Sequence, residues 1–208
     1  MAGSDRLARK YDSSRRQEQA ARTRLQIARA ARRMFLQRGY AGATMAAIAR
    51  EAGCSTATVY AIFRTKQRLL AALLDASLAV DAHVRLPVAF PGSDQRRVLG
   101  AFASELTDTI SRAAPILDIA HTAACTETEI ARRIRHIHES RLEDLSTIAE
   151  HLESTSTLRP GMTGSQVADL LLALSSAETY QLMTQVRGWS KREFATWLAD
   201  TLTRLLLS

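Results

Sequence analysis

The sequence is poor in cysteine, proline and aromatic residues. Its 208 residues include 2 Cys and 4 Pro, and 5% are aromatic. Cys54 and Cys125 form no CxxC pair and are too few for a disulfide framework, which favours a reducing compartment. No apolar run is long enough to span a bilayer, and the polar, Arg-rich start is unlike a secretory signal. We therefore expect a cytoplasmic protein that does not bind a membrane.

Motifs typical of enzymes are also missing. The chain has no Gly-rich phosphate loop, nucleophile elbow or paired-carboxylate motif. His121 and Cys125 lie four residues apart, which suits two metal ligands on one helix face, but no third and fourth ligand accompany them. We expect no enzyme, no metal site and no cofactor. His136 and His138 are expected to face solvent or local partners. Glu178 either orients a ligand or makes an intersubunit or cap-like hydrogen bond.

Positive charge is abundant and unevenly distributed. The net charge is +7, and the pI is about 10.1. Residues 1–68 contain 15 Lys and Arg against 4 Asp and Glu, whereas residues 69–208 contain 13 against 17. A basic third joined to a mildly acidic remainder indicates that one end meets a polyanion such as nucleic acid. A solvated basic surface without a partner is the alternative that charge alone leaves open.

Apolar residues recur with helical spacing along most of the chain, and no segment shows sustained strand-like alternation. We therefore expect an all-α protein of about nine helices. Residues 1–19 should form a flexible basic arm, 20–68 a helix-turn-helix domain, and 69–208 a regulatory domain. The expected helices cover residues 20–38, 45–52, 56–63, 66–82, 94–113, 115–125, 127–154, 164–187 and 191–207, separated by Gly, Pro or capping residues.

The strongest functional signal lies in residues 45–64, MAAIAREAGCSTATVYAIFR. A helix-turn-helix needs a small residue where its helices cross, here Ala49, and a residue that tolerates positive φ in the turn, here Gly53. Val59 and Ile62 can hold the second helix against the first. An ordinary helical hairpin is the alternative, but the caps, inner face and outer face all agree. The outer face carries short side chains suited to the major groove: Thr56, Ala57, Thr58 and Ala61.

The stretch from Ile27 to Leu70 resembles the N-terminal domain of the TetR family of transcriptional regulators. The matching residues are Phe35, Gly39, Tyr40, Thr44, Ile48, Ala49, Ala52, Gly53, Ser55, Thr58, Tyr60, Phe63, Lys66 and Leu69. Residues 168–202 resemble, more loosely, the last two helices of many members. The resemblance implies a dimeric DNA-binding regulator, more often a repressor than an activator.

The resemblance also implies roles for individual residues. Thr44, Ser55, Tyr60 and Lys66 match positions that contact DNA backbone, and hydroxyl and ammonium groups there suit phosphate. The positions matching Thr56, Ala57 and Thr58 face the bases. Members often carry His or an aromatic residue where this chain has Ile62, so one backbone contact is missing. The basic arm either enters a minor groove or adds only general attraction.

The last two expected helices are apolar on more than one side, which predicts a four-helix dimer interface. A monomer core is the alternative. The expected interface residues are Leu171, Leu174, Leu182, Trp197, Leu198 and Leu202.

The middle helices are surplus to DNA binding and dimerisation, so we expect a pocket there for a small apolar or cationic ligand that releases the repressor from a palindromic operator. A closed core, in a dimeric regulator without a small-molecule ligand, is one alternative. An adaptor that no longer binds DNA is another. The expected ligand-binding residues are Phe102, Leu106, Ile110, Leu117, His121 and Ile134.

Overall fold

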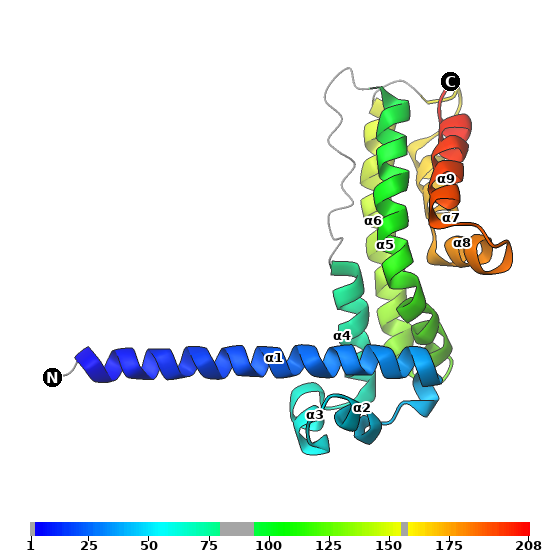
Figure 1. The fold of residues 1–208 in the computed structure, drawn as a ribbon. Helices are drawn as coiled ribbons and strands as arrows, with labels where there is room; N and C mark the ends of the chain where they lie inside the picture. Colours follow the sequence, from blue (N-terminus) through cyan, green and yellow to red (C-terminus); the bar gives the residue numbers. More distant parts are fainter. Residues whose placement is uncertain (1–2, 80–93, 155–157) are drawn as a thin grey trace. The chain divides into compact units, whose positions relative to one another are not determined.

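The computed structural model describes residues 3–79, 94–154 and 158–208, with side chains from residue 17 onward. Over these residues the chain is helical and contains no named strand, which confirms the all-α expectation (Figure 1). It divides into two compact units, Met1–Leu73 and Leu74–Ser208. The elements are α1 (Gly3–Gly42), α2 (Met45–Glu51), α3 (Thr56–Phe63), α4 (Lys66–Ala79), α5 (Gln95–Ala124), α6 (Thr128–Ser154), α7 (Gly164–Leu174), α8 (Ala177–Gln181), the π-helical η1 (Leu182–Val186) and α9 (Lys191–Leu206).

The first unit contains α1 to α3 and the start of α4. Helix α1 begins at Gly3, so residues 3–19 are helical here, whereas we expected an arm outside the helix. Gly39 has a positive φ of 66° and bends the helix near its end. The residues of the expected stripe are all buried, and Tyr40 near the end of α1 is buried as well; the stripe is Ile27, Ala30, Ala31, Met34 and Phe35. An Arg33–Glu51 ion pair, with Nε and Oε1 2.8 Å apart, ties α1 to α2.

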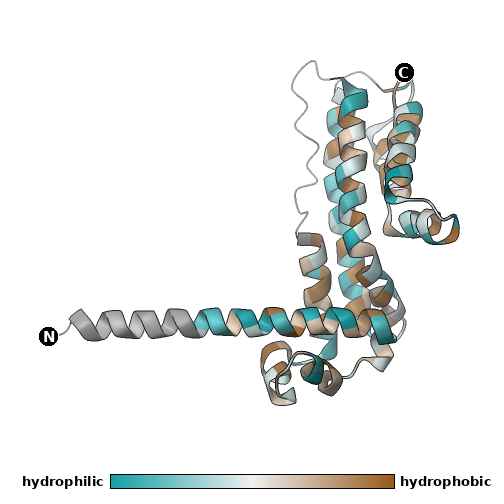
Figure 2. Cartoon of the chain, in the orientation of Figure 1, coloured by the Kyte–Doolittle hydropathy of each residue, from teal (hydrophilic) through white to brown (hydrophobic). Residues whose placement is uncertain are grey.

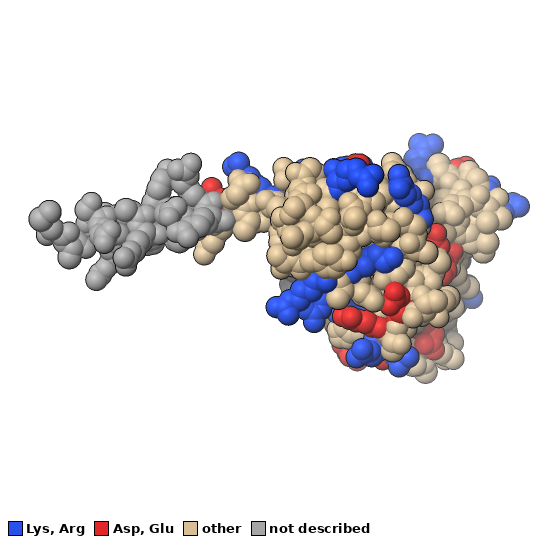
Figure 3. Space-filling view, turned by 90° about the horizontal axis from the view of Figure 1, so that it is seen from below, with Lys and Arg blue, Asp and Glu red and all other residues tan. Residues whose placement is uncertain are grey.

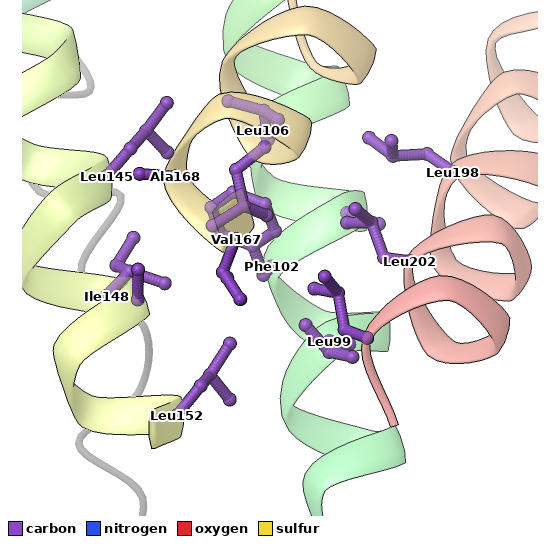
Figure 4. Close-up of a cluster of buried hydrophobic side chains, with 14 of the residues drawn as sticks. Leu99, Phe102, Leu106, Leu145, Ile148, Leu152, Val167, Ala168, Leu198 and Leu202 are labelled. Carbon is purple, nitrogen blue, oxygen red and sulfur yellow. The ribbon is translucent and has the colours of Figure 1, made fainter. Parts of the chain in front are cut away.

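The second unit is built around α5 and α6, which lie side by side, with α7 packed on α6 and α9 on α5 (Figure 1). Hydrophilic and hydrophobic residues alternate along both long helices, as one buried face requires (Figure 2). Figure 4 shows the side chains of four helices pointing toward one another. The labelled members of this cluster are Leu99, Phe102, Leu106, Leu145, Ile148, Leu152, Val167, Ala168, Leu198 and Leu202.

Helix α5 continues through Pro115, where we expected two helices. Proline lacks an N–H and crowds the preceding turn, which costs about 3 kcal/mol in a helix interior. The buried face nevertheless continues on both sides, with Ile110 and Ile116 no more than 2% exposed. The packing of that face accounts for the continuous helix. Its N-cap is Asp94, whose carboxylate accepts from the Arg96 N–H at 3.0 Å. The loop expected around Pro87 and Pro91 lies outside the described residues.

The segment expected as one helix over residues 164–187 consists of three pieces. Helix α7 ends at Leu174, and Ser176 caps α8 by accepting from the Thr179 N–H at 3.0 Å. The π-helical η1 follows α8. Serine competes for helical hydrogen bonds and favours helix starts, so the Ser175-Ser176 pair is the physical cause of the break.

Candidate DNA-binding and regulatory sites

The turn between α2 and α3 is closed by backbone hydrogen bonds. Gly53, with a φ of 67°, donates its N–H to the carbonyl of Arg50 at 3.2 Å. Cys54 donates to the carbonyl of Ala49 at 3.0 Å. These two bonds form a Schellman motif, which satisfies carbonyls at the end of α2 and requires a left-handed residue at Gly53. Ala49 is 2% exposed at the crossing, as expected of the small residue there.

Helix α3 begins with a hydroxyl cap. Ser55 Oγ accepts from the Thr58 N–H at 3.1 Å and lies 2.8 Å from Thr58 Oγ1. Val59 and Phe63 are buried beneath the helix. Ala57 and Tyr60 are exposed on its other side, with half of the Tyr60 surface accessible. The buried side fixes the helix against α2 and leaves a surface of short side chains open.

Two residues that flank the α2–α3 pair, one before α2 and one after α3, hold groups suited to phosphate. Thr44 is exposed and caps α2, with its Oγ1 accepting from the Ala47 N–H at 3.1 Å. Lys66 lies at the start of α4, and its ammonium group donates a hydrogen bond to the Tyr40 carbonyl at 3.0 Å. The same nitrogen lies 4.2 Å from the centre of the Tyr40 ring. An ammonium has three donors, so this anchored group retains capacity for a further acceptor.

The exposed charge of the first unit is almost entirely positive. In residues 17–73 the only acidic residues are Glu18 and Glu51, and Glu51 is paired with Arg33. Figure 3 shows Lys and Arg side chains in several groups around a broad area of other residues, with Asp and Glu side chains gathered toward one side of the view. The exposed cations of this unit are Arg22, Arg24, Arg29, Arg33, Arg38, Arg50, Arg64 and Arg68. Such a surface attracts a polyanion.

The residues expected at a subunit interface divide into two groups. Leu171, Leu198 and Leu202 are fully buried in the core of their own chain, because α5 and α6 cover that side of α7 and α9. Leu174 and Trp197 are partly exposed, and Leu182 is 54% exposed. Beyond those expected, Val186 in η1 is 73% exposed. Within the second unit, the two most exposed large apolar side chains among the described residues are therefore those of η1.

The residues expected to bind a ligand divide into a group in the core and a group that is partly exposed. Phe102, Leu106 and Ile110 belong to the closely packed cluster, and Leu117 is partly buried against it. Ile134 is 8% exposed on α6. His121 is half-buried farther along α5. A cleft of about 500 Å³ lies elsewhere, and none of the expected residues lines it; its lining is Arg159, Pro160, Gly161, Met162, Gln166, Asp169 and Leu170.

His121 has different neighbours from those the sequence suggested. Cys125 donates its thiol to the His121 carbonyl at 3.7 Å instead of joining its imidazole. The His121 ring stacks on that of His138, with centroids 6.2 Å apart and planes 6° apart. His121 Nε2 lies 3.6 Å from Glu178 Oε1. Sequence spacing could not reveal this cluster, because its members come from three helices.

A half-buried arginine supports the break before α8. Arg141 on α6 donates to the Ser175 hydroxyl at 2.9 Å and also to the Ser175 carbonyl. Burial lowers the pKa of Arg141 from its ordinary value, while the charges of Glu178 and Asp144 oppose the shift. Gln181 Nε2 donates to the Ala114 carbonyl at 3.2 Å and ties α8 to α5. These polar contacts had no signal in the sequence pattern.

The fold and the first site define a class: all-helical proteins in which an N-terminal helix-turn-helix precedes a separate helical unit. The family profile described as "Bacterial regulatory proteins, tetR family" matches residues 27–73. This match covers the helix-turn-helix region and agrees with the resemblance to the TetR family found in the sequence. No helix within the described ranges is long and apolar enough to cross a membrane.

Known proteins are similar to this chain in sequence over part of its length and in fold over most of it. The HTH-type transcriptional regulator TtgR of Pseudomonas putida is 33% identical over 136 residues, which are 62% of this chain. The match spans 63% of the length of TtgR, less than two thirds. A transcriptional regulator from Saccharomonospora viridis in complex with choline has a TM-score of 0.72 and 18% identity, covering 90% of this chain and 99% of its own. The SmeT–triclosan complex has a TM-score of 0.71 and 19% identity, and the match covers 89% of this chain and 92% of the SmeT chain.

Proposed function

We propose that this protein is a transcriptional regulator that binds DNA through α2 and α3 and is not an enzyme. The observation that carries the proposal is the geometry of α3: it is fixed from below by Val59 and Phe63, while its short side chains face outward. A helix of this kind can enter the major groove, and the surrounding cations supply attraction to phosphate. The similarity to TtgR, a transcriptional regulator, supports the same function.

Within this site, Thr44, Ser55, Tyr60 and Lys66 contact the DNA backbone, while Thr56, Ala57 and Thr58 face base edges. Phosphate contacts position a protein without specifying sequence, whereas base contacts specify it. Lys66→Ala should therefore weaken binding on all sequences and reduce the slope of log affinity against log salt by about 1. Thr58→Ala should change preference at one position of each half-site.

Lys191→Ala is the matched control for Lys66→Ala. It removes the same charge from the second unit, where Lys191 pairs with Asp108. We expect it to leave DNA affinity and its salt dependence unchanged. Binding to the selected operator and to scrambled duplexes, measured by fluorescence anisotropy at several salt concentrations, compares the variants. An altered base preference with intact affinity in Lys66→Ala would contradict its assignment to phosphate.

The protein acts as a homodimer on a palindromic operator. Exposed apolar side chains support this proposal: Leu182 and Val186 on η1, with Trp197 and Leu174 partly accessible near them in the chain. Leu182→Asp should dissociate the dimer, because an unpaired charge in a buried interface is strongly unfavourable. Leu142→Asp is the matched control, since Leu142 is 39% exposed on α6. Sedimentation velocity at micromolar concentration should show dimers for the control and monomers for Leu182→Asp.

The regulator is a repressor that a small apolar or cationic ligand releases from DNA. Two structural neighbours support a ligand response, one in complex with triclosan and one with choline. Because Phe102, Leu106 and Ile110 pack in the core, the more accessible half of the expected site, around Leu117 and His121, is where a ligand would enter. Screening apolar and cationic compounds for release of operator DNA tests this, with Leu117→Trp expected to abolish the response of a compound that occupies the pocket.

The second candidate is a dimeric DNA-binding regulator without a small-molecule ligand. The close packing of Phe102 and Ile110, both no more than 2% exposed, favours it. Under this alternative, occupancy of the operator depends on protein concentration alone. Failure of every compound class to release the operator, together with unchanged operator binding by Leu117→Trp, would favour this candidate over the ligand-responsive repressor.

A further inference from the structure

Three potential metal ligands meet in the second unit, one from each of three helices. His121 lies on α5, His138 on α6 and Glu178 in the first turn of α8. Their ligand atoms all lie within 4.8 Å of one another. His121 is half-buried, and the other two are exposed, so the cluster is open to solvent on one side. No other group of three or more His, Cys, Asp or Glu side chains with this spacing occurs among the described residues.

Contacts outside the cluster hold the short helix α8, which carries Glu178, against α5 and α6. Ser176 caps α8 and fixes the turn that carries Glu178, while Arg141 anchors the neighbouring Ser175 at 2.9 Å. Gln181 ties the other end of α8 to the carbonyl of Ala114 on α5. A fixed α8 backbone reduces the ordering that binding of a metal by Glu178 would require. The packing of α5, α6 and α8 therefore brings the three residues to one place.

The donor set also discriminates between metals. Two imidazoles and one carboxylate suit Zn²⁺, Co²⁺, Ni²⁺ or Fe²⁺, whereas Mg²⁺ and Ca²⁺ prefer oxygen ligands. Bonds of roughly 2.0–2.2 Å to one metal bring such ligand atoms about 3–3.5 Å apart. His121 Nε2 and Glu178 Oε1 are already 3.6 Å apart. Small rotations of the exposed His138 and Glu178 side chains suffice to close the remaining distance.

We propose that His121, His138 and Glu178 form a binding site for one first-row transition-metal dication, with Zn²⁺ the best fit and solvent completing the coordination. This site goes beyond the proposed function, because metal binding can be measured without DNA. A bound ion would link α5, α6 and α8 and so stabilise the second unit. Without metal, the same groups form a stacked histidine pair and a His121–Glu178 contact, which is the alternative explanation of the cluster.

The experiment titrates the full-length, tag-free chain with Co²⁺ and follows its d–d absorption, followed by displacement with Zn²⁺. All proteins carry Cys125→Ser, because an exposed thiol binds these metals by itself. His121→Ala, His138→Ala and Glu178→Gln are the test variants. His136→Ala is the matched control, since His136 is exposed on the same helix as His138 but lies outside the cluster.

We expect one Co²⁺ per chain, displaced by Zn²⁺, and a higher melting temperature with Zn²⁺ by mass action. Each histidine variant should weaken binding on the order of 100-fold and Glu178→Gln on the order of 10-fold, while His136→Ala should have no effect. Absence of saturable Co²⁺ binding, or affinity unchanged in His138→Ala, would overturn the proposal. Metal binding by a protein that fails to bind DNA would leave this site standing and remove only the regulatory function.

Discussion

Replacing Gly53 with alanine tests whether the α2–α3 turn needs a left-handed residue. Gly53 has a φ of 67°, and an added Cβ at this position would meet no atom within 4 Å. The cost of Gly53→Ala therefore comes from the backbone alone. For residues with a Cβ, the left-handed conformation costs about 1–2 kcal/mol. Asn tolerates this conformation better, so Gly53→Asn should be less destabilising than Gly53→Ala.

Gly100→Ala is the matched substitution, and we expect it to change stability in the opposite direction. Gly100 lies within α5, and a Cβ there would also meet nothing within 4 Å. Glycine is less favourable than alanine in a helix interior by about 0.5–1 kcal/mol, so this change should stabilise the protein by that amount. The same added methyl group thus destabilises one unit and stabilises the other, because only the backbone conformation differs.

Urea unfolding followed by circular dichroism measures both effects, with the two units treated as separate transitions where they separate. We expect the first unit to lose about 1–2 kcal/mol in Gly53→Ala, equivalent to roughly 4–8 °C in melting temperature for each kcal/mol. Gly53→Ala should also weaken operator binding, because it disturbs the α2–α3 angle. Equal stability of Gly53→Ala and the parent, or equal costs for the Ala and Asn variants, would refute this account of the turn.

Other substitutions test the core and the caps. Phe102→Ala should lower the free energy of unfolding of the second unit by about 3–5 kcal/mol in the same assay. Leu142→Ala on the surface should change that free energy by less than about 0.5 kcal/mol. Similar values for the two variants would contradict the assignment of the core. Ser55→Ala should cost about 1 kcal/mol by removing the α3 cap, and no loss would mean that the cap is redundant. Hydrogen bonds from Ser190 lower the pKa of Glu193. The stabilisation by this capping box should therefore be present above the ordinary glutamate pKa and be lost as pH falls through the lowered value. Glu193→Gln should remove that pH dependence of stability, and a dependence that persists in the variant would assign it to another group.

Local patterns in the sequence predicted most elements of the first unit. The small residue at Ala49, the glycine at Gly53 and the hydroxyl caps at Thr44 and Ser55 each act through neighbours a few residues away. Helices α6 and α9 were likewise predicted from the periodic spacing of their apolar residues. These features are visible in sequence because the interactions that produce them are local.

Features that depend on distant residues were not predicted. Helix α5 continues through Pro115 because its buried face packs on other helices, which overrides the local cost of proline. Leu198 and Leu202 looked available for a partner subunit, but α5 covers them within the same chain. His138 and Glu178 join His121 only after three helices have packed. An apolar stripe or a histidine in a sequence does not identify the element that will face it.

The most direct test of the central claim is selection of operator sequences from random duplex DNA by the intact protein. A dimer with two copies of α3 should select an inverted repeat whose half-sites lie about one helical turn or slightly more apart. Affinity for that sequence should fall steeply with salt, since the basic first unit displaces counterions from phosphate. Selection that yields no inverted repeat, or affinity that does not change with salt, would contradict the claim that this chain binds DNA as a dimer through α2 and α3.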